Sequence, residues 1–220
     1  MIVFYIVMVV LCYLIGSISP GIIISKLKGK GDIREHGSGG TGATNVNRTL
    51  GTKYGILVLM LDCLKAIIPL LIIKYLMYIT SFFSISSDIM DMSSSLMPAP
   101  HPIDIYFPAL AVMLGHIFPI WHKFKGGKGV AVALGVLFVI NWQFTLIILA
   151  VFLLIVIVFR YISLGSIAAA VSFPLLNLMT KDRDLIIFSC VLALIVIWTH
   201  KQNILRLLEG KENKFSFKKS

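Results

Sequence analysis

Long apolar runs alternate with short polar segments along most of the chain. The apolar runs cover residues 2–24, 55–80, 105–120, 130–159, 163–180 and 185–200. About 20 consecutive apolar residues form a helix that is long enough to cross a bilayer. The first run lacks a basic leading segment and a small-residue cleavage site, so we expect a retained span and not a removed signal. The pattern predicts an all-α, polytopic membrane protein that forms a single domain over residues 1–220.

The run 130–159 is ambiguous. As one helix, its thirty residues would be about 45 Å long, which exceeds a hydrocarbon core of roughly 30 Å. The stretch "NWQ" from Asn141 offers a polar break. We therefore expect two short helices, 130–140 and 144–159, that each fall short of a full span and form a hairpin. One continuous span is the alternative.

Positive charge is concentrated between particular runs. Lys and Arg gather in 26–53, in 121–129, at Arg160 and in the tail from Lys201, whereas 81–104 has none. Cytoplasmic loops of membrane proteins are enriched in Lys and Arg, so these four places are expected on the cytoplasmic side. With the hairpin, this gives seven transmembrane helices, with the N-terminus outside and the C-terminus in the cytoplasm. The connection 81–104 is then expected to be a solvated external connector.

Composition supports a membrane protein and narrows the range of partners. The chain is 58% hydrophobic and 14% charged, whereas a soluble domain is about half apolar and a quarter charged. The net charge of +10 suggests membrane orientation and anionic headgroups. Nucleic acid is disfavoured because no basic segment lies in a recognisable binding fold. The three cysteines lie in apolar runs without metal-binding spacing, so neither a metal site nor a disulfide framework is expected.

Two Gly-rich polar segments on the predicted cytoplasmic side carry the candidate chemistry. The first is "GSGGTGATNVNR" from Gly37, and the second is "KFKGGKG" from Lys123. Glycines allow backbone N–H groups to form concave nests that bind anions, and a helix beginning near Val130 would add a favourable N-terminus. No Walker P-loop is present. A single such segment is more simply a basic connector at lipid headgroups, but two on one face favour phosphate binding.

Two further polar clusters lie on the same side. Their members are Arg160, Ser163 and Ser166 in one, and His200, Asn203 and Arg206 in the other. The spacing i, i+3, i+6 places each set on roughly one helix face. A polar helix end at the membrane interface is the simpler interpretation of each cluster. Four polar clusters on one side favour a single site.

Ionisable residues also occur inside the apolar runs. Asp62 and Lys65 are three residues apart in the second run, and such groups are functional candidates in a membrane segment. A mutual ion pair that orients helices is the alternative, and it is slightly favoured. His116 lies near a helix end before a proline, where a structural and a catalytic role are about equally expected.

Together these motifs resemble the bacterial acyl-phosphate-dependent glycerol-3-phosphate acyltransferases of the small integral-membrane type. The matching stretches are "GSISPG" from Gly16, "GSGGTGATNVNR" from Gly37, "LDCLK" from Leu61, "GHIFPIWHKFKGGKGVA" from Gly115, "RYISLGS" from Arg160 and "THKQNILRLLEGKENKF" from Thr199. The resemblance implies a seven-helix protein of the bacterial cell membrane with its active site facing the cytoplasm. It also implies transfer of a fatty acyl group from acyl phosphate to the 1-hydroxyl of glycerol 3-phosphate. The products would be lysophosphatidic acid and phosphate, at the first step of phospholipid synthesis.

The resemblance also implies the site residues. Its catalytic positions fall on Ser38, Arg48, Lys128, Ser163, His200 and Asn203. Adjoining residues expected to bind substrate are Gly39, Gly42, Thr44, Asn45, Lys125, Gly126, Gly127, Gly129 and Ser166. The family usually has Asn where this chain has Gly40, which removes an amide. The expected partners are acyl phosphate, glycerol 3-phosphate and membrane lipids, with no cofactor, no metal and no nucleic acid. The expected oligomeric state is a monomer.

The implied chemistry agrees with the residues. Acyl phosphate is already an activated mixed anhydride, so no acyl-enzyme nucleophile is needed, and no candidate triad or H-x-x-x-x-D dyad is present. Catalysis would then rest on positioning and charge stabilisation. A small-anion transporter is the main rival, but it needs polar groups along a path to the other face. A lipid-binding structural protein is a third hypothesis, which the Gly- and Lys-rich segment disfavours.

Overall fold

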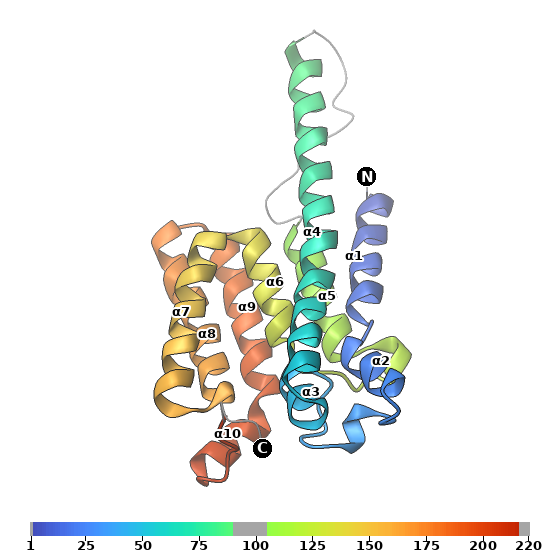
Figure 1. Cartoon of the computed structure of the whole chain (residues 1–220). Coiled ribbons are helices and arrows are strands. Elements are labelled where there is room, and N and C mark those ends of the chain that lie inside the picture. The colour runs from blue at the N-terminus through green and yellow to red at the C-terminus, as the bar shows by residue number, and fades with distance from the viewer. Residues whose placement is uncertain (1, 90–104, 216–220) are drawn as a thin grey trace. The chain divides into compact units, whose positions relative to one another are not determined.

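The computed structural model describes residues 2–89 and 105–215, and every regular element in these residues is a helix (Figure 1). This confirms the predicted all-α class. The chain divides into two compact units. Unit 1 comprises Met1–Gly127 and Ala131–Val139, and unit 2 comprises Lys128–Val130 and Ile140–Ser220. The expectation of a single domain stays a prediction.

The first predicted span, 2–24, is interrupted. Helix α1 (Ile2–Gly16) ends before Ser17, and α2 (Pro20–Leu27) begins after an extended residue, Ser19. Pro20 lacks a backbone N–H and disfavours helical backbone at the residue before it, so the helix stops and restarts there. The segment Tyr5–Leu27 still forms a candidate membrane span of 23 residues.

Helices α1 and α5 (Tyr106–Ile117) cross closely within unit 1 because glycines face the neighbouring backbone. A Cβ on Gly16 would lie 2.2 Å from the carbonyl oxygen of Val112, and one on Gly115 would lie 2.2 Å from that of Tyr13. Small residues at such crossings are typical of membrane helices. With 12 residues, α5 is about 18 Å long, so it is shorter than the span predicted at 105–120.

Helix α4 (Thr52–Ile89) extends beyond the predicted run 55–80. Residues 81–89, which we expected in an external connector, continue the helix instead. The remainder of that connector, 90–104, lies outside the described residues. The segment Thr52–Ile79 is a candidate span of 28 residues.

The break predicted within 130–159 is confirmed. Helix α6 (Val130–Ile140) ends before Asn141, and α7 (Trp142–Phe159) begins after it. Asn141 is extended, and its side-chain oxygen accepts the N–H of Phe144 at 3.0 Å, as a helix N-cap does. Because the cap lies at Asn141, α7 begins two residues earlier than predicted and has 18 residues. It is a candidate span by itself, so the expectation that both helices would fall short of a span is wrong for α7.

In unit 2, α8 (Ile162–Asn177) packs between α7 and α9 (Arg183–Thr199), as the yellow-to-red helices of Figure 1 show. The side chain of Asp182 caps α9 by accepting the N–H of Leu185 at 3.0 Å. Helix α10 (Lys201–Leu208) follows α9 after a 60° bend.

Four helical segments in the described residues are long and apolar enough to cross a membrane, or five if the bent pair α9 and α10 is one span. Only 17% of the α7 window is buried within the protein, and exposed Leu154, Ile157 and Val158 lie on it. Such apolar surface is suited to lipid contact. The seven spans and the sides of the two termini stay predictions.

Two short 3₁₀ helices lie in unit 1, η1 (Ile33–Glu35) and η3 (Ile120–His122), and a third, η4 (Leu178–Thr180), lies in unit 2. A short α-helix, α3 (Ala43–Leu50), contains the second half of the first Gly-rich segment. Element η1 precedes that segment, and η3 precedes the second one.

Candidate functional site

The first Gly-rich segment is organised by Asn45 on α3. The Asn45 amide nitrogen donates to the carbonyls of Ile33, His36 and Gly40 at 3.1, 2.9 and 2.8 Å. Its side-chain oxygen accepts the N–H of Ser38 at 2.7 Å. The predicted substrate-binding Asn45 therefore uses its whole amide to hold the segment in shape, and its contact with substrate stays a prediction.

An apolar cluster anchors the same segment to the helices of unit 1. Ile33 and Val46 are fully buried against Ile22 of α2 and Val58 of α4. A Cβ on Gly21 of α2 would lie 1.9 Å from the carbonyl oxygen of Thr41, so the segment and α2 touch backbone to backbone. The segment is consequently held both by this apolar cluster and by the backbone of α2.

The other predicted residues of this segment differ in their surroundings. Gly39 has a φ of 72°, in the left-handed region that favours glycine. Gly40 has space for a Cβ, since the nearest heavy atom to an added Cβ is 3.9 Å away. Gly42 caps α3, Thr44 is half-buried on that helix, and Arg48 is exposed near its end. No hydrogen bond or ion pair occupies the Arg48 guanidinium in the described residues.

The second Gly-rich segment packs against the end of α5 within unit 1. The N–H groups of Gly126 and Gly127 donate to the carbonyls of Ile117 and His116 at 3.0 and 3.2 Å. An added Cβ would lie 2.0 Å from the His116 carbonyl oxygen at Gly126, and 2.3 Å from His116 Nε2 at Gly127. These glycines therefore have a packing role, and the anion nest expected from them stays a prediction.

A cavity of about 400 Å³ lies beside both Gly-rich segments in unit 1. Its lining residues are Asp32, Arg34, Glu35, Gly39, Lys123, Lys125 and Gly126. Three cations and two carboxylates thus meet at one cavity, and the predicted substrate-binding residues Gly39, Lys125 and Gly126 are among its walls.

A buried ionic cluster joins α4, α5 and the break after α1. Lys65 Nζ lies 2.8 Å from Asp62 Oδ1, 2.8 Å from the carbonyl oxygen of Ile18 and 2.9 Å from His116 Nδ1. The same His116 Nδ1 lies 3.4 Å from Asp62 Oδ1, so one ring nitrogen faces both partners of the ion pair. The ion pair expected as one alternative is therefore present, and it connects helices.

In unit 2, the predicted residues Lys128, Ser163 and Asn203 meet around Glu212. The Lys128 ammonium donates to the side-chain oxygen of Asn203. Asn203 and Ser163 donate to Glu212 Oε1 at 2.7 and 2.9 Å, and Arg206 Nε donates to Oε2 at 2.8 Å. One carboxylate thereby holds side chains from α8 and α10 in a single network.

Glu212 joins these predicted residues in one network, and our sequence analysis did not single it out as a candidate. Its side chain is 6% exposed, and burial raises the pKa of the carboxyl group. Hydrogen bonds from Arg206, Asn203 and Ser163 outweigh that effect, so the net pKa is lowered and the carboxylate is ionised at neutral pH. An acidic residue in the basic stretch "GKENK" was the available sequence signal.

His200 and Ser166, two further predicted residues of unit 2, are buried and make local hydrogen bonds. His200 Nδ1 donates to the Val196 carbonyl at 2.8 Å, which leaves Nε2 with a lone pair. Ser166 donates to the carbonyl of Ile162 in its own helix at 2.9 Å. The expectation that Arg160 shares a helix face with the two serines is wrong, because Arg160 ends α7 with a φ of 65° and α8 begins at Ile162.

Comparison with known proteins assigns the family. A family model described as glycerol-3-phosphate acyltransferase matches residues 6–210. The chain belongs to the glycerol-3-phosphate acyltransferase family. A protein of that name from Syntrophotalea carbinolica is 42% identical over 213 residues, which are 96% of this chain and 97% of the relative. One from Aquifex aeolicus is 41% identical over 209 residues, covering 94% and 97%.

Solved structures of one relative agree with this acyltransferase assignment. The crystal structure of PlsY (YgiH), an integral membrane glycerol 3-phosphate acyltransferase, in its glycerol 3-phosphate form has a TM-score of 0.80 and 39% identity, with 96% of each chain covered. Its lysophosphatidic acid form gives 0.77 and 38%, covering 96% of this chain and 95% of that one. The resemblance inferred from the motifs is confirmed, and the acyltransferase is an integral membrane protein.

The predicted site residues are divided between the two units of the acyltransferase. Unit 1 holds Ser38 and its neighbours with Lys125, Gly126 and Gly127, whereas Lys128 and Gly129 belong to unit 2. In the described part of the chain, no cluster of three or more His, Cys, Asp or Glu side chains is placed to hold a metal ion.

Proposed function

We propose that this acyltransferase moves a fatty acyl group from acyl phosphate to the 1-hydroxyl of glycerol 3-phosphate. The hydroxyl oxygen bonds to the acyl carbon, the bond from that carbon to the phosphate oxygen breaks, and the departing phosphate takes the hydroxyl proton. The products are lysophosphatidic acid and inorganic phosphate, at the first step of phospholipid synthesis. The relative's structures in glycerol 3-phosphate and lysophosphatidic acid forms support the acceptor and the product.

The main observation in support of this proposal is the hydrogen-bond network around Glu212 in unit 2. Lys128 is held by Asn203, which is held in turn by the ionised Glu212. A cation fixed in this way is preorganised for an anionic phosphate, so little order is lost when the substrate binds. Ser163 contacts the same carboxylate and would be oriented by it.

We assign roles to the catalytic residues on that basis. Lys128 and the exposed guanidinium of Arg48 balance phosphate charge, since Arg suits the fork geometry of phosphate oxygens. Ser38, Ser163 and Asn203 orient substrate oxygens by hydrogen bonds. His200 offers Nε2 as an acceptor for the glycerol hydroxyl. No single side chain is an obligatory base, because the departing phosphate accepts the proton.

The proposed substrate-binding residues contact the substrates through their backbone or from positions next to the catalytic residues. These residues are Gly39, Gly42, Thr44, Asn45, Lys125, Gly126, Gly127, Gly129 and Ser166. Gly39 and Gly129 have positive φ values of 72° and 82°, so they allow turns that expose backbone N–H groups. Asn45, Gly126 and Gly127 act chiefly by shaping the segments that hold the others.

We further propose seven membrane spans, with the N-terminus outside and the active site and C-terminus in the cytoplasm of a bacterial cell, in a monomer. The clustering of Lys and Arg supports this orientation. Helices α5 and α6 are short, with 12 and 11 residues. Short helices suffice where irregular backbone at membrane depth is enclosed by protein.

Acyl phosphate is expected to be the direct donor. The thiol of Cys63 donates to the Ala131 carbonyl at 3.1 Å, which is a packing contact and not the arrangement of an acyl-accepting nucleophile. Purified acyltransferase is given glycerol 3-phosphate with acyl phosphate, acyl-CoA or acyl carrier protein, and lysophosphatidic acid is measured. Turnover with acyl phosphate alone supports the proposal, and equal turnover with acyl-CoA contradicts it.

The orientation is testable by labelling single cysteines in a variant without Cys12, Cys63 and Cys190. Cysteines placed at Lys30, Lys123 and Lys211 are expected to resist an impermeant thiol reagent added to intact cells. A cysteine at Ser94, which lies outside the described residues, is expected to react as the positive control. Labelling at Lys123 from outside would instead favour a different number of crossings.

A further inference from the structure

An ion pair ahead of the first Gly-rich segment has no part in the proposed chemistry. Asp32 caps η1, and its Oδ1 accepts the backbone N–H of Arg34 at 3.0 Å. Its carboxylate also accepts hydrogen bonds from Nε of Arg34 at 3.0 Å and from Nη2 of Arg34 at 2.6 Å. The guanidinium of Arg34 is therefore fixed in orientation along the one edge that carries Nε and Nη2.

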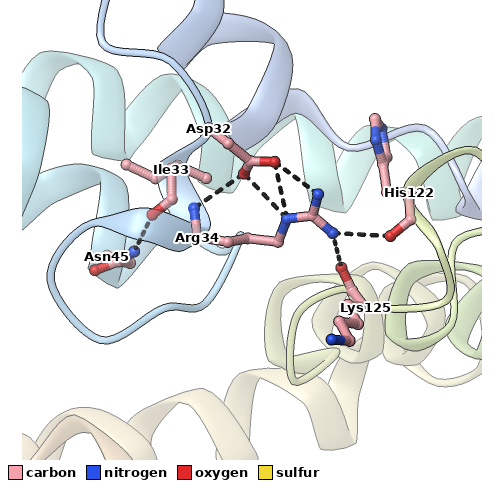
Figure 2. Close-up of polar contacts among 6 residues, drawn as sticks. All are labelled: Asp32, Ile33, Arg34, Asn45, His122 and Lys125. Carbon is pink, nitrogen blue, oxygen red and sulfur yellow. Dashed lines mark hydrogen bonds and ion pairs between the residues drawn. The ribbon is translucent and has the colours of Figure 1, made fainter.

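The remaining nitrogen of Arg34 reaches the second Gly-rich segment, as Figure 2 shows. Its Nη1 donates to the carbonyl oxygens of His122 and Lys125 at 2.8 and 3.0 Å. Between these carbonyls lie Lys123 and Phe124, with φ values of 56° and 57°. Left-handed backbone is unfavourable for residues with a Cβ and persists where the surroundings hold it. Arg34 is one such restraint.

The preceding residue, Ile33, completes the link. Its carbonyl oxygen accepts the Asn45 amide at 3.1 Å, and Asn45 organises the first Gly-rich segment (Figure 2). Two adjacent residues of η1 thus connect the two segments, since Ile33 binds the first and Arg34 binds the second. Both segments line the same cavity in unit 1.

We propose that Arg34 is a positioning residue of the acyltransferase, which sets Lys125 and Gly126 at a fixed place relative to Gly39. This proposal rests on the proposed function for its kinetic consequence. Arg34 acts through backbone carbonyls and not mainly through substrate, because its donors are largely used. Of the five N–H groups of a guanidinium, Asp32 takes two, and the two on Nη1 face the carbonyls of His122 and Lys125.

Lysine is not an adequate replacement for Arg34. An ammonium is a compact charge on a flexible stem, whereas the planar fork donates in fixed directions to the Asp32 carboxylate and to the two carbonyls at once. Arg34→Lys is therefore expected to behave more like Arg34→Ala than like the unaltered protein. Asp32→Asn keeps Arg34 but frees its orientation, so a smaller effect in the same direction is expected.

The test measures hydrogen exchange and kinetics on full-length acyltransferase in detergent. In Arg34→Ala and Arg34→Lys, amides in residues 119–127 are expected to exchange faster, while those of α7 to α9 are unchanged. The KM for glycerol 3-phosphate is expected to rise roughly tenfold or more, with a smaller change in kcat, because displaced binding groups weaken substrate positioning.

Two control variants separate this role from a loss of charge. Lys30→Ala removes an exposed cation from the same region and is expected to change neither measurement. Lys125→Ala removes a side chain but keeps the carbonyl that Arg34 binds, so exchange in 119–127 is expected to stay slow.

Unchanged exchange in the Arg34 variants would overturn the proposal, and so would faster exchange with an unchanged KM. If the unaltered protein transfers no acyl group from acyl phosphate, the proposed function fails. The exchange measurement still decides whether Arg34 holds the second segment, so the two failures are distinguishable.

Discussion

Replacing Asp62 with Ala is expected to lower the free energy of unfolding by about 3–5 kcal/mol, the usual range when one partner of a buried ion pair is removed. Asp62 and Lys65 have side chains that are 1% and 7% exposed. Without the carboxylate, the Lys65 ammonium keeps its contacts with the Ile18 carbonyl and His116 Nδ1 but loses its opposite charge. Water cannot replace that charge at a buried position inside a candidate membrane span.

Thermal unfolding of the detergent-solubilised protein measures this effect. Glu209→Ala is the matched control, since Glu209 pairs with Lys211 at 3.0 Å where both side chains are more than half exposed. Such a surface pair contributes about 0–1 kcal/mol. The double variant Asp62→Ala with Lys65→Met removes both charges and is expected to recover part of the lost stability. If the double variant is less stable than Asp62→Ala, the unpaired charge of Lys65 does not explain the loss of stability.

The ionic cluster also lies next to the predicted site. The carbonyl of His116 accepts the N–H of Gly127, and the imidazole of His116 lies against that glycine. Loss of Asp62 therefore disturbs the support of the second Gly-rich segment as well as the packing of α4 and α5. The structural role of His116, one of two alternatives open from the sequence, accounts for its contacts.

Much of the fold followed from the sequence because apolar runs and polar breaks act locally. The end of α6 at Asn141 was predictable, since a short polar side chain at that point caps the next helix. The extension of α4 to Ile89 was not, because hydropathy falls along residues 81–89 while a helix already formed continues cooperatively. The break before Pro20 is visible in "GSISPG", but the apolar run 2–24 by itself predicts one uninterrupted span.

Site residues that belong to a local sequence motif could be predicted. Residues whose position depends on a contact with a distant part of the chain could not. Lys128, Ser163 and Asn203 were identified together, and they share one network. Glu212 and Arg34 were not, because each binds a partner far along the chain, although Asn203 and Arg206 lie only nine and six residues from Glu212. Ser163 is 49 residues from Glu212, and His122 is 88 residues from Arg34. The spacing of neighbouring residues in the sequence does not predict contacts between residues this far apart.

The glycines of the second segment show a different limit. A Gly-rich sequence predicts close backbone approach, but it does not say to what. Gly126 and Gly127 approach the His116 backbone and ring, and the phosphate contact expected of them stays a prediction. The same residue type fits both functions because each requires the absence of a Cβ.

Replacing Lys128 with Ala is expected to slow acyl transfer roughly ten- to hundred-fold. A charge-assisted hydrogen bond contributes about 1.5–3 kcal/mol, and each 1.4 kcal/mol is about tenfold in rate or binding. Lys128 is the cation that the network of Asn203 and Glu212 holds in place. Its loss removes phosphate attraction and leaves the Asn203 oxygen without that donor.

Acyl-transfer rates against glycerol 3-phosphate concentration, at matched membrane expression, decide this prediction. Lys211→Ala is the control, because Lys211 is 73% exposed and pairs only with the exposed Glu209 in the described residues. Lys125→Ala is expected to fall between the two, since the Lys125 side chain is exposed at the cavity of unit 1 and no hydrogen bond or ion pair within residues 2–89 and 105–215 fixes it. Thermal unfolding of each variant shows whether α10 remains folded. If Lys128→Ala is folded and has near-normal kinetics, Lys128 does not bind the phosphate, and contact with lipid headgroups becomes the better explanation of this charged segment.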